Sequence, residues 1–108
     1  MRPPEIGELR DELVLEQHIR ESSTGGGAVL TWDPLGSLWA HIRPLGGHET
    51  VFAGQIVSRV SHEIWIRQRA GTVAGMRLRQ EARIFDILAV RPAGARGQWM
   101  RCLCRQRI

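Results

Sequence analysis

SLWAHIRPL, residues 37–45, is the stretch of sequence that decides the fold. Its side chains alternate with the period of two that is typical of a strand with two differently used faces. One face carries Leu38, Ala40 and Ile42, and the other carries Trp39, His41 and Arg43. Pro44 removes a backbone donor and the two glycines at 46–47 let the chain turn away. We predict a central strand that ends here, with its apolar face in the core.

Further strands are predicted on both sides of this one. Alternating or β-branched patterns lie at 9–22, 28–32, 60–69, 76–79, 83–90 and 98–105. Turn residues separate them at 22–27, 33–36, 71–75, 80–81 and 92–97. Residues 1–8 are expected to form an irregular arm, and residues 46–58 a long loop with one helical turn. The pattern predicts one all-β domain over 1–108: a small β-barrel, or a sandwich, of six or seven short, mainly antiparallel strands.

For two of the later strands, the alternation also predicts which side chains point into the core and which point outward. In the strand at 60–69, the inward residues are Val60, His62, Ile64 and Ile66, and the outward residues are Glu63, Trp65, Arg67 and Arg69. In the last strand, one face carries Met100, Cys102 and Cys104. Because a disulfide between residues two apart in a strand is strained, we expect both cysteines to be reduced core thiols.

Composition places the chain among ordinary globular domains. Its hydrophobic fraction is 43% and its charged fraction 24%. No apolar run approaches the roughly 20 residues that a membrane-spanning helix needs. The acidic N-terminal stretch MRPPEIGELRDE has no apolar segment typical of a signal peptide, so we expect a cytoplasmic location.

The charge is unevenly distributed along the chain. All 15 basic residues are arginine, and the net charge is +4. Residues 1–63 hold nine acids and five arginines, whereas residues 64–108 hold ten arginines and two acids. This polarity suits head-to-tail contact between copies or one acidic partner, and it is also compatible with a simple solvated surface.

Catalytic and metal-binding patterns are missing from the sequence. The histidines at 18, 41, 48 and 62 have no structural-zinc spacing, and the pair Cys102–Cys104 is only a weak Cys-x-Cys match. There is no Gly-x-Ser-x-Gly elbow, and the glycines at 25–27 precede a strand instead of a phosphate-binding helix. We therefore predict a protein that is not an enzyme and has no metal or cofactor.

An arginine and tryptophan surface is the remaining candidate for function. Its residues are Trp65, Arg67 and Arg69 on one strand and Arg77 and Arg79 on a nearby one. Small barrels bind single-stranded nucleic acid on such surfaces through stacking and phosphate contacts. Alternatively, the arginines cover strand faces and pair with acidic groups at an interface.

The ordered set of strand motifs resembles the head closure proteins of tailed phages, also called head–tail joining, adaptor or stopper proteins. The resemblance runs from about Gly7 to Cys104 and is carried by GELR (7–10), TW (31–32), LWAHIRPL (38–45), SHEIWIR (61–67), GMRLR (75–79), RIFDI (83–87) and LC (103–104). Gene transfer agents, which are phage-derived particles, use similar parts.

The resemblance implies a small β-barrel whose copies form a ring below the portal–adaptor complex, close the DNA channel after packaging and dock the tail. Its partners would be the portal or adaptor, a tail protein and packaged double-stranded DNA, with assembly in the host cytoplasm and a final place in the neck of the particle. It assigns the channel loop to Gly46, Gly47, His48, Glu49, Thr50, Val51, Phe52, Ala53, Gly54 and Gln55. We place the subunit or adaptor interface at Trp39, Arg43, Trp65, Arg67, Arg69, Arg77 and Arg79. The alternatives are a small nucleic-acid-binding barrel, or another neck or tail-terminator component of the same particle.

Overall fold

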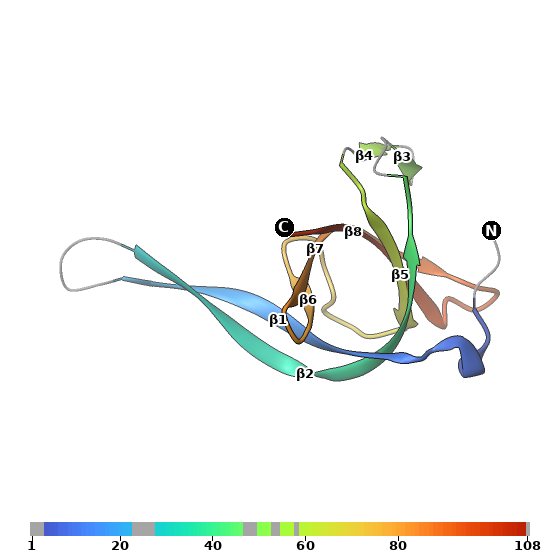
Figure 1. The fold of residues 1–108 in the computed structure, drawn as a ribbon, viewed down its shortest axis with the longest axis horizontal. Coiled ribbons are helices and arrows are strands. Elements are labelled where there is room, and N and C mark those ends of the chain that lie inside the picture. Colours follow the sequence, from blue (N-terminus) through green and yellow to red (C-terminus); the bar gives the residue numbers. More distant parts are fainter. Residues whose placement is uncertain (1–3, 23–27, 47–49, 53–54, 58, 108) are drawn as a thin grey trace.

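A closed antiparallel β-barrel is the body of the protein in the computed structural model, which describes residues 4–22, 28–46, 50–52, 55–57 and 59–107 (Figure 1). The neighbouring strands around the barrel are β1, β2, β5, β8, β7 and β6, and β3 and β4 form a separate two-stranded sheet. The elements are η1 (Ile6–Glu8), β1 (Asp11–Ser22), β2 (Ala28–Pro44), β3 (Thr50–Phe52), β4 (Gln55–Val57), β5 (His62–Arg67), β6 (Arg77–Gln80), β7 (Arg83–Ala93) and β8 (Trp99–Gln106). The predicted all-β barrel is confirmed. None of the described helices is long and apolar enough to cross a membrane.

The barrel core is built from the inward residues of all six strands. Ala40, Ile64 and Ile66 are fully buried, and Leu38 and Ile42 pack against them, as the alternation predicts. The rest of this core is Leu13, Leu15, Leu78, Phe85, Ile87, Met100, Cys102 and Cys104. Both cysteines are free, and burial raises the pKa of Cys102 to about 12. They therefore act as small apolar side chains.

The predicted turn at 33–36 is wrong, because these residues form a β-bulge inside one long strand. Leu15 pairs with Gly36 and Glu16 with Pro34, which leaves Leu35 as the extra residue of β2. A bulge tolerates a proline that has no donor, and Gly36 takes a φ of +143° that favours glycine. The same residues that are typical of a turn therefore bend β2 without ending it.

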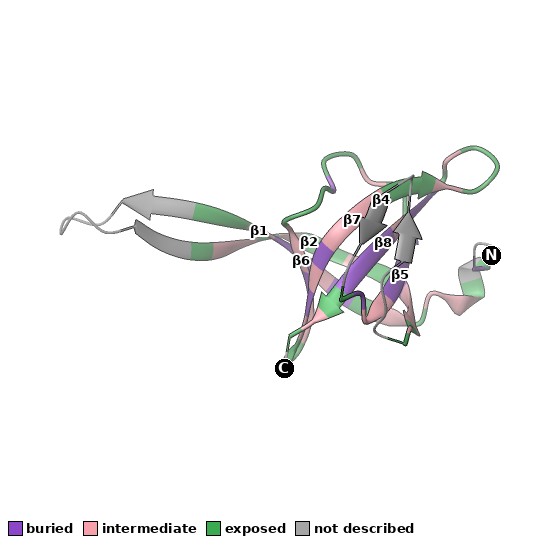
Figure 2. Ribbon diagram, turned by 90° about the horizontal axis from the view of Figure 1, so that it is seen from above, coloured by how far each residue is buried: buried purple, intermediate pink, exposed green. Residues whose placement is uncertain are grey.

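Beyond the bulge, β1 and β2 leave the barrel as a two-stranded arm, residues 17–22 paired with 28–33 (Figure 2). β1 pairs with β6 only from Val14 to Glu16, so farther out the two strands pair only with each other within the described residues. Contacts on Trp32 fasten the base of the arm: the Arg77 guanidinium lies 4.1 Å from its ring centroid, and the His18 ring meets it edge-on.

Residues 46–58 contain two short strands instead of the predicted helical turn. Thr50 pairs with Val57 and Phe52 with Gln55 in an antiparallel ladder. β-branched residues such as Val51 and Ile56 favour this extended pairing over a helix. Residues 47–49, 53–54 and 58 lie outside the described part of the chain. At the base, the Leu45 amide donates to the Ser61 carbonyl (2.8 Å) and closes the β3–β4 segment onto the barrel.

A second buried layer lies on the outer face of β5, where exposed residues were predicted. Glu63 and Trp65 are not part of the barrel core, in agreement with their predicted outward direction, but Glu63 is fully buried and Trp65 is 2% exposed, so the prediction of an exposed surface at Trp65 is wrong. The N-terminal segment lies against this face, because His41, the cross-strand partner of Trp65, donates from Nδ1 to the Glu8 carbonyl oxygen (3.2 Å). Alternation alone predicts opposite faces, but it does not predict that both are covered.

Candidate interaction surface

The seven predicted interface residues fall into three groups in the structure. Trp39, Arg67 and Arg69 line a groove at one end of the barrel. Arg43, Arg77 and Arg79 form ion pairs within the chain. Trp65 is buried and cannot contact a partner directly, so it is removed from the predicted interface.

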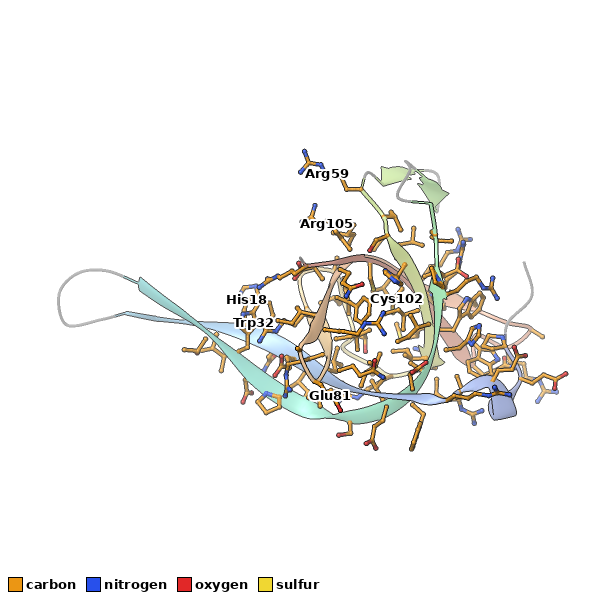
Figure 3. All side chains as sticks on the ribbon, in the orientation of Figure 1. His18, Trp32, Arg59, Glu81, Cys102 and Arg105 are labelled. Atoms are coloured by element: carbon orange, nitrogen blue, oxygen red, sulfur yellow. The ribbon has the colours of Figure 1, made fainter. Side chains whose placement is uncertain are left out.

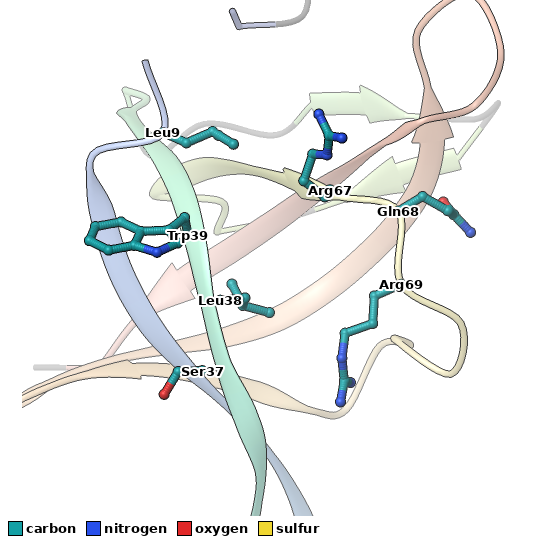
Figure 4. Close-up of a pocket in the computed structure, with 7 residues that line it drawn as sticks. All are labelled: Leu9, Ser37, Leu38, Trp39, Arg67, Gln68 and Arg69. Atoms are coloured by element: carbon teal, nitrogen blue, oxygen red, sulfur yellow. The ribbon is translucent and has the colours of Figure 1, made fainter. Parts of the chain in front are cut away.

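The groove has a volume of about 600 Å³ and lies where β2 separates from β5 (Figure 4). The β2–β5 ladder begins only at Ala40, so the preceding residues of β2 have no strand partner on that side in the described chain. The lining residues are Leu9, Ser37, Leu38, Trp39, Arg67, Gln68 and Arg69. Trp39 is 54% exposed and points away from β2 on the side opposite to Leu38. An exposed tryptophan beside apolar side chains is typical of a protein-binding anchor.

The groove is positively charged on its β5 side. Arg69 donates from Nη2 to the Leu35 carbonyl oxygen in the bulge (3.2 Å), and Arg67 lies 5.5 Å from the centroid of the Trp99 ring. Neither guanidinium forms an ion pair with a described carboxylate. Both charges are therefore available to an acidic partner.

A second hollow of about 500 Å³ lies on the other side of Trp39. Its lining residues are Arg10, Glu12, Val14, Trp39, Arg79, Gln80 and Glu81. Glu12 and Glu81 are exposed and form no ion pair with a described arginine. Trp39 thus lies between a groove that holds Arg67 and Arg69 and a mixed hollow in which two glutamates stand beside two arginines. Sequence reasoning missed Leu9, Glu12 and Glu81, because a single exposed leucine or glutamate carries no pattern.

Arg43 belongs to a buried network around Glu63. Oε1 of Glu63 accepts from Trp65 Nε1 (2.6 Å) and Arg43 Nη1 (3.3 Å), and Oε2 accepts from Arg101 Nε (2.6 Å). A carboxylate without solvent exposure needs such compensation. Arg43 therefore has a role in holding β2, β5 and β8 together.

Arg77 and Arg79 are paired with Glu16 of β1. Their Nε atoms donate to the two carboxylate oxygens of Glu16 at 2.7 and 3.2 Å. Burial alone would raise the pKa of Glu16, but the hydrogen bonds and charges of the two arginines outweigh it and lower the pKa below its ordinary value. These arginines stabilise the join between β6 and the start of the arm.

The predicted channel-loop residues are only partly described. Gly46 is exposed, and Thr50–Phe52 and Gln55 lie in the two strands of the β3–β4 sheet. The other residues of that set, 47–49 and 53–54, lie outside the described chain. Within the part that is described, no three His, Cys, Asp or Glu side chains gather as metal ligands.

Comparison with known proteins identifies the family. A family model described as phage head completion protein matches residues 4–107. A chain of the virion of a native gene transfer agent particle is 30% identical, with a TM-score of 0.70, over 99% of this chain and 98% of that chain. The solution structure of a protein from Shigella flexneri 2a has a TM-score of 0.68 at 22% identity, over 94% of this chain and 95% of that chain, and supports the fold alone. No match was found among curated proteins. The chain belongs to the phage head completion protein family.

Proposed function

We propose that this protein is a structural subunit of the head–tail junction whose copies form a ring, close the DNA channel after packaging and dock the tail. Family membership and the similarity to a gene transfer agent virion chain support a structural role in the particle.

The observation that carries the proposal is the arrangement of unlike surfaces around Trp39. A ring is built from heterologous contacts, in which one patch of a subunit meets a different patch of the next. The Arg67–Arg69 groove is positively charged. The second hollow offers the carboxylates of Glu12 and Glu81, which form no ion pair with a described arginine, although Arg10 and the Glu16-bound Arg79 also line it. Trp39 lies between them and has the exposed apolar area that an interface anchor needs.

The β3–β4 segment is the proposed channel element. It leaves the barrel after Pro44, is closed at its base by the Leu45–Ser61 hydrogen bond, and lies on a different side of the barrel from the arm (Figure 1). A short segment on a rigid barrel can reach toward the ring axis while the barrel makes the subunit contacts. The arm is then free to contact a further component.

Complementation of a gene deletion tests the function. Without the protein, we expect heads that package DNA but do not retain it, together with unattached tails. Normal infectious or transducing particles from the deletion strain would overturn the proposal. Retention of DNA with failure of tail attachment alone would reject channel closure and indicate a terminator-like role.

Variants of the interface separate assembly from folding. We expect Trp39→Ala and the double variant Arg67→Glu/Arg69→Glu to fold but to fail in complementation. The matched control is Arg91→Glu/Arg96→Glu, which makes the same charge change on exposed residues outside the groove. Arg77 and Arg79 are unsuitable, because their reversal would place acidic groups beside the buried carboxylate of Glu16.

A compensating variant tests the pairing of the two patches. Adding Glu12→Arg/Glu81→Arg to the reversed arginines restores opposite charges between neighbouring copies. Partial recovery of particle yield is expected from the fourfold variant. If the fourfold variant assembles no better than the double variant, the two patches do not meet.

The single-strand-binding alternative is weakened by the burial of its stacking surface. Trp65, the aromatic residue of the predicted arginine and tryptophan surface, is 2% exposed, so a base cannot stack on it in the folded barrel. Titration with single-stranded DNA at two salt concentrations tests this alternative. Tight binding with a steep salt dependence would favour it.

A further inference from the structure

Arginines gather at the end of the barrel from which the β3–β4 segment departs. The Ser61 amide donates to the Cys104 carbonyl (2.9 Å), and the Gln106 amide donates to Ser61 Oγ (2.7 Å). Ser61 is therefore held against Cys104 and Gln106 of β8. Arg105 lies between these two residues and Arg59 lies two residues before Ser61, so the two arginines are close together. Figure 3 shows both side chains at this end of the barrel, and both are exposed.

Two further arginines belong to the same end. Arg83 lies 4.9 Å from the centroid of the Phe85 ring, which packs edge-on against His62 at 5.0 Å. Arg107 pairs with Asp86 (2.9 Å). Asp86 is also the cross-strand neighbour of Arg105, but its carboxylate is bound to Arg107. We call Arg59, Arg83, Arg105 and Arg107 the arginine end.

The arginine end has a strong excess of positive charge. It holds four arginines, of which only Arg107 is paired with a carboxylate, that of Asp86, and the other three form no ion pair with a described carboxylate. The side-chain partner of Arg83 is the neutral Gln80 amide oxygen (3.3 Å). A guanidinium group without an acidic partner favours an anionic ligand that accepts two parallel hydrogen bonds. Phosphate and carboxylate groups are the two candidates.

We propose that the arginine end binds the phosphate backbone of double-stranded DNA. A protein partner would need an apolar anchor among the charges. Among the residues whose side-chain burial the structure describes, which leaves out, among others, 20–30 and 47–58, the exposed large hydrophobic residues are Ile19, Trp39 and Val73, and none of them belongs to this end. A phosphate backbone needs only spaced positive charges. The inference rests on the proposed function for its biological setting, since the arginine end adjoins the segment placed toward the DNA channel.

Salt-dependent DNA binding by the intact purified protein tests the site. The probe is a labelled duplex of about 20 base pairs, followed by fluorescence anisotropy between about 50 and 200 mM salt. The test variant is Arg59→Asn/Arg105→Gln. Asparagine is chosen at 59 because Arg59 has a φ of +61°, which asparagine tolerates better than most residues. The matched control is Arg91→Gln/Arg96→Gln, which removes two exposed arginines that belong neither to the arginine end nor to the groove around Trp39.

The expected result is a selective loss of salt dependence. The slope of log K against log salt concentration should become shallower by roughly 1.8 in the test variant, at about 0.9 for each phosphate contact removed, and should not change in the control. Equal slopes in the two variants, or no measurable duplex binding by the parent protein at about 50 mM salt, would overturn the site. Unchanged DNA binding with lost particle assembly would overturn it in favour of an acidic protein partner.

The outcome is independent of the test of the proposed function. Titration with the purified protein reports only on the site, whereas complementation of the deletion reports on the particle. If the DNA slope changes as expected but the deletion strain makes normal particles, the head–tail role fails and the site remains. If the slopes are equal while the deletion prevents DNA retention, the site fails and the role remains.

Discussion

Replacement of Glu63 by glutamine should destabilise the barrel strongly without changing its shape. Glu63 is fully buried, and its two oxygens accept from Trp65, Arg43 and Arg101. Glutamine has nearly the same volume but no charge. Its amide nitrogen would also face an N–H donor of Trp65, Arg43 or Arg101 where the wild-type carboxylate accepts a hydrogen bond. Breaking a buried ion pair in this way costs about 3–5 kcal/mol. The side chains of Arg43 and Arg101 are 32% and 25% exposed, so water compensates in part and we expect roughly 2–4 kcal/mol.

Urea unfolding followed by tryptophan fluorescence measures this loss. With a denaturant dependence of roughly 1.5 kcal/mol per molar urea, the midpoint should fall by about 2 M. The control is Glu12→Gln on the exposed face of β1, which should stay within about 0.5 kcal/mol of the parent. A Glu63→Gln midpoint within about 0.3 M of the parent would refute the reasoning that this network holds β2, β5 and β8 together.

Three further predictions concern single sites. Glu81 has a φ of +53° in the turn between β6 and β7, so Glu81→Gly should raise stability by roughly 0.5–1 kcal/mol, and a lower melting temperature would contradict this. Burial and the neighbouring Arg83 lower the pKa of His62 below 6.5, so the unfolded chain binds the proton first and stability should fall as the pH drops below about 6.5. His62→Gln should lose that part of the pH dependence in denaturation at several pH values; an unchanged profile would count against it. Because burial raises the pKa of both cysteines, Cys102 and Cys104 should react with a thiol reagent only as fast as the protein unfolds, and rapid labelling of the native protein would disprove their burial.

The sequence predicted the fold where one rule decided the outcome. Alternation placed Ala40, Ile64, Ile66 and Cys102 in the core, and the structure confirms all four. The prediction failed where the same residue types are compatible with two different local structures. Pro34 and Gly36 suit a turn and a bulge equally, and the pairing of β1 across Leu35 decided for the bulge.

The candidate surface was less predictable, because accessibility depends on contacts distant in sequence. Trp39 and Trp65 alternate in the same way along their strands, yet Trp39 is 54% exposed and Trp65 is 2% exposed. Trp65 belongs to the buried network of Glu63, Arg43 and Arg101, whereas Trp39 lines an open groove. Likewise, the pairing of Arg77 with Glu16, 61 residues apart, is set by the β1–β6 register and not by any local pattern.

A cryo-EM map of the neck of a particle that carries this protein tests the central claim most directly. The head–tail role predicts a ring of these barrels between head and tail, with the β3–β4 segment toward the axis and the groove around Trp39 covered by a neighbouring copy. A neck that lacks the protein, or barrels that leave the Trp39 groove facing solvent, would contradict the account.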